Sequence, residues 1–131
     1  MTHNFLQFLL IGLAAACGAW LRFLTGIIVH NIYPGLPLGT LVVNLLGGLF
    51  MGMSIAYFEN FSNSSEEVKL IINIGLLGGL TTYSAYTADI FYLIREGVFI
   101  NALVFIFAHI IGALMLCYIG YYLINLFLQP S

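Results

Sequence analysis

The stretch Gly75-Leu-Leu-Gly-Gly-Leu-Thr-Thr-Tyr-Ser-Ala-Tyr-Thr-Ala-Asp89 lies inside a hydrophobic segment that is long enough to cross a bilayer. Glycines, a run of hydroxyl and ring side chains and one acid make a poor surface for lipid. Free backbone groups and hydroxyls are costly in hydrocarbon unless protein, water or an ion satisfies them. We therefore expect this stretch to line a site.

The composition is that of a membrane protein. Of the 131 residues, 62% are hydrophobic and 6% are charged, whereas soluble domains carry about 25% charged residues. The net charge of −2, with three lysines and arginines in all, argues against a nucleic-acid partner, because phosphate backbones are bound by clusters of positive charge. The lipid bilayer is therefore the expected partner.

Four apolar segments predict the architecture. Each is close to the roughly 20 residues that a bilayer requires, and they cover residues 5–29, 38–58, 68–94 and 98–127. A tight turn, Tyr33-Pro-Gly-Leu-Pro37, separates the first two. A polar loop, residues 59–67, separates the next two, and Ser65 is placed to cap the third helix. We expect one all-α domain over residues 1–131, with four transmembrane helices.

Four spans place both termini on one side of the membrane. Positive charges near the span ends set the orientation, but Lys69 stands on the terminal side against Arg22 and Arg95 on the other. One charge against two is a weak bias. The chain is therefore expected to insert in either orientation, or to depend on a partner that fixes it.

The third span is expected to break at mid-membrane. Glycine weakens a helix by about 1 kcal/mol relative to alanine, and Gly75, Gly78 and Gly79 are followed by two threonines. A break frees carbonyls that can bind small cations. Beyond it, the side chains of Tyr83 and Tyr86 share a face, and their electropositive ring edges could meet an anion.

Several polar residues in the spans leave two interpretations open. Asn44 is either a contact between helices or a ligand for something polar. Arg22, on a stripe with small residues of the first span, either snorkels to the interface or attracts an anion at a pore mouth. His109 is either a satisfied structural histidine or a pH-sensitive donor that faces a pore. For Asp89 we favour a pair with Arg95 over a proton-coupled carboxylate.

Three motifs together resemble the Fluc/CrcB fluoride channel family over essentially the whole chain. In order, they are Gly18-Ala-Trp-Leu-Arg-Phe23, Gly39-Thr-Leu-Val-Val-Asn-Leu-Leu-Gly47 and Gly78-Gly-Leu-Thr-Thr-Tyr-Ser-Ala-Tyr86. They resemble the family's G-A-x-x-R-aromatic, G-T-x-x-x-N-x-x-G and G-G-x-T-T-F-S-T-F patterns. Each motif falls in the expected span, which makes the match specific.

The resemblance implies an antiparallel, dual-topology dimer with two fluoride pores and a central structural sodium ion. The backbone carbonyls of Gly78 and Thr81 would ligate the sodium, and Arg22 would lie near a vestibule. Asp89 takes the position of a family glutamate. The fluoride pores would be lined by Asn44, Tyr83, Tyr86, Ser84, Thr40, Thr82, His109 and Phe105.

The chain departs from the family pattern at the pore. Tyr83 and Tyr86 replace two phenylalanines, Ala85 replaces the threonine between them, and Phe105 and His109 stand where tyrosine and serine are usual. These departures leave open a homodimer, or a heterodimer in which this chain is a non-conducting partner subunit.

The expected function is passive export of fluoride through the cell membrane of a prokaryote, as a channel and not an enzyme. A small proton-coupled multidrug exporter of dual topology is the alternative. That class needs a carboxylate in the first span, and residues 5–29 contain none.

Overall fold

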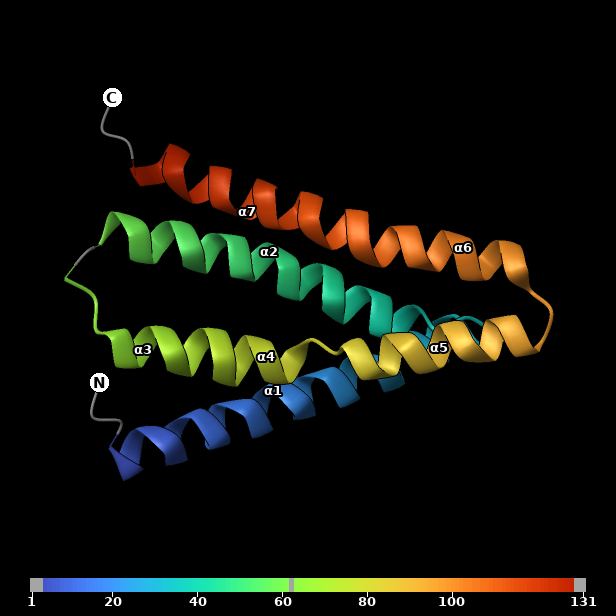
Figure 1. Cartoon of the computed structure of the whole chain (residues 1–131), viewed down its shortest axis with the longest axis horizontal. Helices are drawn as coiled ribbons and strands as arrows, with labels where there is room; N and C mark the ends of the chain where they lie inside the picture. Colours follow the sequence, from blue (N-terminus) through green and yellow to red (C-terminus); the bar gives the residue numbers. More distant parts are fainter. Residues whose placement is uncertain (1–3, 62, 129–131) are drawn as a thin grey trace.

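The computed structural model describes residues 4–61 and 63–128, which form four long helical spans with both ends of the chain on one side (Figure 1). All four spans are long and apolar enough to cross a membrane, which confirms the all-α prediction. The first two are α1 (Phe5–Ile32) and α2 (Leu38–Asn60). The third is α3 (Glu66–Leu70), η1 (Ile71–Leu77), α4 (Gly78–Leu80) and α5 (Tyr83–Arg95). The fourth is α6 (Phe99–Phe107), η2 (Ala108–Gly112) and α7 (Ala113–Leu128).

The connections follow the turn chemistry of the sequence. Gly35, in the turn between α1 and α2, has a φ of 110°, and Gly97, between α5 and α6, has a φ of 78°. Residues that carry a side chain rarely adopt positive φ angles, so glycine suits both turns. The side chain of Ser65 accepts a hydrogen bond from the Glu67 N–H at 3.2 Å, which is the predicted cap of α3.

The third span is broken, but not at its glycines. Gly75 lies in the π-helical segment η1, and Gly78 and Gly79 lie in α4. The extended residues are Thr81 (φ −83°, ψ 155°) and Thr82 (φ −151°, ψ 123°). Figure 1 shows this interruption between α4 and α5 halfway along the span. The expected break is confirmed: of the glycines and two threonines that predicted it, only the threonines have extended backbone.

The glycines instead let the third span approach α1. A methyl group on Gly79 would overlap the backbone of Ala15, and one on Gly18 would overlap the backbone of Leu76. A methyl on Gly12 would meet nothing within 4 Å. The packing stripe of α1 therefore runs through Ala15 and Gly18. Of the small residues expected to share a stripe with Arg22, which are Gly12, Ala15, Ala19 and Gly26, this contact confirms Ala15 and not Gly12.

Glycines also bring α2 against α7. A methyl on Gly52 would overlap the carbonyl of Cys117, and one on Gly120 would overlap the carbonyl of Leu49. Small residues of this kind allow two membrane helices to pack at backbone distance. The contact holds α2 and α7 side by side along much of their length (Figure 1).

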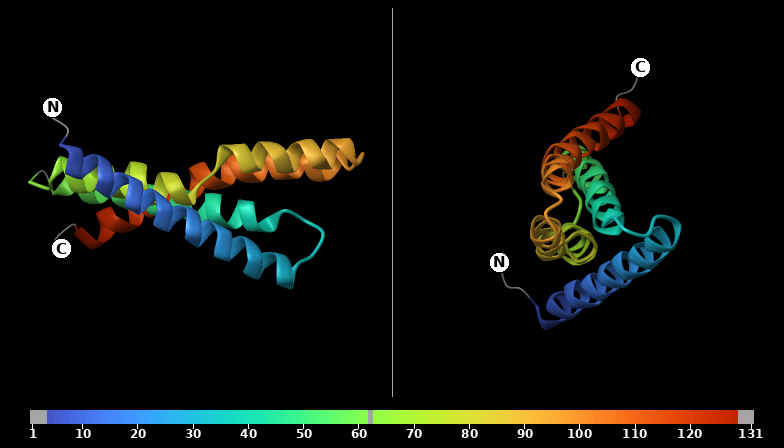
Figure 2. Two further views of the ribbon diagram at one scale, coloured as in Figure 1. Left: turned by 90° about the horizontal axis from the view of Figure 1, so that it is seen from below. Right: turned by 90° about the vertical axis from the view of Figure 1, so that its right-hand side faces the viewer.

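The bundle divides beyond the break. Figure 2 shows α5 and α6 leaving together in one direction, while the adjoining ends of α1 and α2 leave in another. The first arm has its own small core, which Ile90, Leu93, Ala102 and Phe105 form. A cavity of about 400 Å³ lies where the arms part, lined from one side by Gly39 and Thr40 and from the other by Asp89 and Glu96, among others.

Candidate functional site

The break in the third span is held by Asn44 of α2. The Asn44 Oδ1 accepts a hydrogen bond from the Thr82 N–H at 2.8 Å, and its Nδ2 donates to the Thr82 carbonyl at 3.0 Å. One side chain thus satisfies both backbone groups of an extended residue inside the membrane. Asn44 therefore makes the contact between helices that was one of its two expected roles. The second hydrogen of its NH2 group has no bond to any residue that the structure describes.

Thr82 also starts the helix that follows. Its Oγ1 accepts a hydrogen bond from the Ala85 N–H at 3.1 Å, which caps α5. The same Oγ1 lies 3.2 Å from the exposed Ser84 hydroxyl. The two hydroxyls predicted for a pore therefore lie together at the N-terminus of α5, where backbone N–H groups favour negative charge.

Two carbonyls at the break lose their usual helical donors. In a continuous helix Gly78 would accept from Thr82 N–H and Thr81 would accept from Ala85 N–H. These donors are bound instead by Asn44 and by the Thr82 hydroxyl. Such carbonyls are suitable ligands for a small cation.

Arg22 reaches the same break. Its Nη1 donates to the Thr81 carbonyl at 3.2 Å, and the side chain is half-buried. Arg22 was expected near a vestibule, and the structure places its guanidinium at the level of the break. The Thr81 carbonyl has two lone pairs, so one remains for a second partner.

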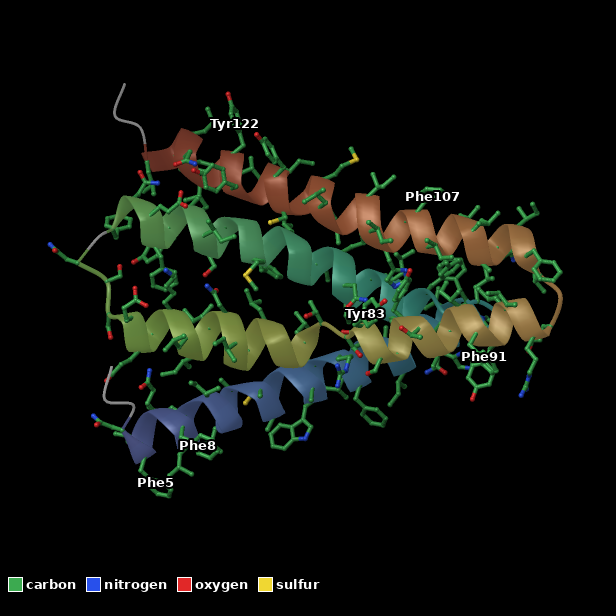
Figure 3. All side chains as sticks on the ribbon, in the orientation of Figure 1. Phe5, Phe8, Tyr83, Phe91, Phe107 and Tyr122 are labelled. Carbon is green, nitrogen blue, oxygen red and sulfur yellow. The ribbon has the colours of Figure 1, made fainter. Side chains whose placement is uncertain are left out.

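A pocket of about 360 Å³ adjoins the break. It combines one amide, two threonines, two tyrosines, a histidine and apolar residues. The Tyr83 side chain is 80% exposed at its rim (Figure 3), and its ring centroid lies 5.5 Å from that of Tyr86. The residues that line the pocket are Asn44, Gly47, Gly48, Met51, Thr81, Thr82, Tyr83, Tyr86, His109, Ile110 and Ala113.

His109 is the most buried polar residue of this pocket. It is 6% exposed, its ring lies 4.5 Å from that of Tyr86, and its Nδ1 lies 2.9 Å from the Phe105 carbonyl oxygen. Its Nε2 is buried without a partner among the described residues. Phe105 itself packs in the core of α5 and α6 and does not line the pocket.

Asp89 and Thr40 lie in the cavity between the two arms. The Asp89 carboxyl group interacts with the Thr40 hydroxyl and, at longer range, with His109. The guanidinium of Arg95 instead lies over the Tyr92 ring, 5.2 Å from its centroid. Within residues 4–61 and 63–128, the one ion pair is Lys69 with Glu66. The expected pair of Asp89 with Arg95 is therefore wrong.

Sequence reasoning missed the role of Gly47. A methyl group there would overlap the Thr81 side chain, so the glycine leaves room for the break to lie against α2. The signal was available, because Gly47 lies one turn beyond Asn44 on the same helix face. The binding of both Thr82 backbone groups by Asn44 had no comparable signal.

Comparison with known proteins gives consistent matches. A family model described as CrcB-like protein, Camphor Resistance (CrcB), matches residues 9–121. A protein of Thiobacillus denitrificans named fluoride-specific ion channel FluC is 38% identical over 115 residues, which is 88% of this chain and 93% of that protein. Proteins of the same name from Nitrosospira multiformis and Escherichia coli O1:K1 are 42% identical over 110 residues and 38% identical over 114 residues. These matches cover 84% and 87% of this chain, and 86% and 90% of those proteins.

Proposed function

The chain belongs to the CrcB-like protein family, and we propose that it is a channel that lets fluoride leave a bacterial cell passively. The observation that carries the proposal is the pocket of ring and hydroxyl groups beside a broken membrane helix. Relatives that share about two fifths of their residues with this chain bear the name of fluoride-specific channels.

The pocket offers what a fluoride pore needs. Fluoride is strongly hydrated, so a pore must replace its water with other donors. The free hydrogen of Asn44, the hydroxyl of Thr82 and the ring edges of Tyr83 and Tyr86 are such donors, and the Ser84 hydroxyl lies 3.2 Å from that of Thr82. Among the described residues no lysine or arginine lines the pocket, so these donors would hold an anion without a permanent positive charge.

A second copy of the chain, inserted in the opposite orientation, would complete each pore. Tyr83 is 80% exposed at the level of the break, where an inverted copy would cover it. Lys69 and Arg95 balance each other at the two ends of the bundle, which suits insertion both ways. The partner is an identical chain or a related subunit.

A sodium ion would lie between the two copies. The Gly78 and Thr81 carbonyls of one chain would supply part of its ligands, and the partner the rest. The ion would neutralise carbonyl dipoles that the break leaves without their helical donors.

Fluoride efflux from liposomes tests the function. Purified protein in vesicles loaded with potassium fluoride should release fluoride, measured with a fluoride electrode, much faster than empty vesicles. Release only after addition of a related subunit would assign this chain to a heterodimer. Release no faster than from empty vesicles, with and without such a subunit, would refute the channel. Uptake of a cationic dye driven by a proton gradient would instead favour an exporter.

A further inference from the structure

His109 is held in one tautomer by its own helix. A carbonyl oxygen can only accept a hydrogen bond, so the 2.9 Å contact with the Phe105 carbonyl requires a hydrogen on Nδ1. The neutral ring then carries a lone pair, and no hydrogen, on Nε2. That atom is fully buried and has no partner in the described part of the chain.

The ring that carries this atom lines the pocket beside the break. His109 is second in the π-helical segment η2, and π-helical turns within α-helices are frequent at functional sites. The ring centroid lies 4.5 Å from that of Tyr86, with the rings tilted by 46°, and both residues line the pocket that Asn44 also lines. A lone pair at this position would repel fluoride.

Each element packed around the ring presents different groups to it. From α5, the Tyr86 ring lies against it at a tilt of 46° and the Asp89 carboxyl group lies within electrostatic range. The α2 residues that line the pocket are Asn44, Gly47, Gly48 and Met51, and none of them titrates. From its own span, Phe105, Ile110 and Ala113 are apolar neighbours. Asp89 is thus the carboxyl group that these elements bring within electrostatic range of the ring.

We propose that His109 is a proton-dependent fluoride ligand that raises the flux of the channel in acid. This inference rests on the proposed function and adds a regulation of the same site. When Nε2 carries no hydrogen, it is a hydrogen-bond acceptor like fluoride itself, and the pocket excludes the anion. A proton from solution on Nε2 turns the same atom into a charged donor, and fluoride enters the pocket against it.

Flux measured at two pH values tests the proposal. Between about pH 8 and about pH 5.5, which bracket the ordinary histidine pKa of about 6.5, efflux above the empty-vesicle leak should rise about tenfold. That is the effect of one charge-assisted hydrogen bond. His109→Gln, whose amide does not titrate, should give equal efflux at both values. His30→Gln, which changes an exposed histidine of α1, should keep the response.

Nuclear magnetic resonance of histidine-labelled wild-type protein gives a readout that does not depend on flux or on the folding of a variant. Because linkage is reciprocal, sodium fluoride in place of sodium chloride at fixed pH should move the His109 ring nitrogens toward their protonated signature. Spectra of His30→Gln, which remove one competing histidine signal, help the assignment.

The outcomes separate the regulation from the function. A fluoride flux whose pH response survives His109→Gln, or which falls in acid, would overturn the role of His109 and leave the channel intact. A His109 signal that does not shift when fluoride replaces chloride would also overturn the role of His109 and leave the channel intact. No flux at any pH, together with no response of the His109 signal, would overturn both proposals.

Discussion

Asn44 binds both backbone groups of Thr82, and this pairing explains how an extended residue persists inside a membrane helix. An unbonded N–H or carbonyl in hydrocarbon costs several kcal/mol. Asn44 removes that cost for two groups at once. Asn44 also lines the pocket, with a side chain that these two bonds hold in place.

Asn44→Asp should abolish the pore. Aspartate keeps the acceptor for the Thr82 N–H but loses the donor to the Thr82 carbonyl, and it brings a negative charge to the proposed fluoride path. Liposome efflux should fall by at least about tenfold, since a repulsion of about 1.4 kcal/mol is enough for that factor.

Ser54→Ala is the matched control for Asn44→Asp. It removes a different hydrogen bond of α2, from the Ser54 hydroxyl to Asn73 of η1, and the pocket is untouched. Efflux through Ser54→Ala should match the wild type. Undiminished efflux through Asn44→Asp would remove Asn44 from the fluoride path.

Single residues were predicted best where their chemistry permits few roles. A mid-membrane asparagine must find polar partners, so Asn44 was expected to bind another helix or a polar ligand, and the structure shows the contact with another helix. Arg22 and Asp89 were harder, because their partners depend on how the spans cross. The sequence spacing favoured Arg95 for Asp89, whereas the division of the bundle sets Asp89 beside Thr40.

At the scale of elements, the start of α5 is stabilised by a single hydroxyl. Thr82→Val keeps the shape of the side chain but removes the acceptor for the Ala85 N–H. The free energy of unfolding should fall by about 1 kcal/mol, as for other lost helix caps. Thr82→Ser should restore most of it. Titration with sodium dodecyl sulfate in mixed micelles, followed by circular dichroism, measures both, and equal losses in the two variants would exclude the cap.

The contact between α2 and α7 depends on backbone proximity. Gly52→Ala would drive a methyl group into the Cys117 carbonyl. Overpacking of this kind costs about 1–3 kcal/mol, which the same denaturant titration should report. Gly12→Ala, where the methyl group meets nothing within 4 Å, should change stability by less than about 0.5 kcal/mol. Equal stability of Gly52→Ala and wild type would show that the helices can separate without cost.

Elements were predictable in number and order but not in fine structure. Apolar length fixes the spans, because the bilayer thickness allows few alternatives. The π-helical segments η1 and η2 left no sequence signal. Glycine was taken as the cause of the break because it weakens helices, yet Gly75 and Gly79 serve close packing against α1. Tertiary contact thus outweighs helix propensity.

For the whole molecule, the proposed sodium site predicts a stability that depends on sodium concentration. If two chains share the ion through Gly78 and Thr81, dimer stability should fall by up to about 1.4 kcal/mol for each tenfold dilution of sodium above its dissociation constant. Thermal dissociation of the dimer measures this, with N-methylglucamine holding the ionic strength constant. Stability that does not respond to sodium would remove the ion from the dimer.

Because positive charge is balanced at the two ends of the bundle, added arginines should fix the orientation of the chain in the membrane, and this can be tested. Arg22 is bonded to the break at mid-span, so Lys69 and Arg95 are the described basic residues left near the span ends. Arginines at the exposed Asn63 and at Ser64, on the side of the termini (Figure 1), should hold that side in the cytoplasm. Arginines at the exposed Asn31 and Tyr33 should hold the opposite side there.

An antiparallel dimer needs one chain of each orientation. Asn63→Arg with Ser64→Arg, or Asn31→Arg with Tyr33→Arg, should therefore leave cells sensitive to fluoride when produced alone, while the two together restore resistance. Labelling of a cysteine introduced in the 33–37 turn reports which side each variant exposes. Full fluoride resistance from one variant, with its turn labelled from a single side, would contradict the antiparallel arrangement, because every pore would then come from chains of the same orientation.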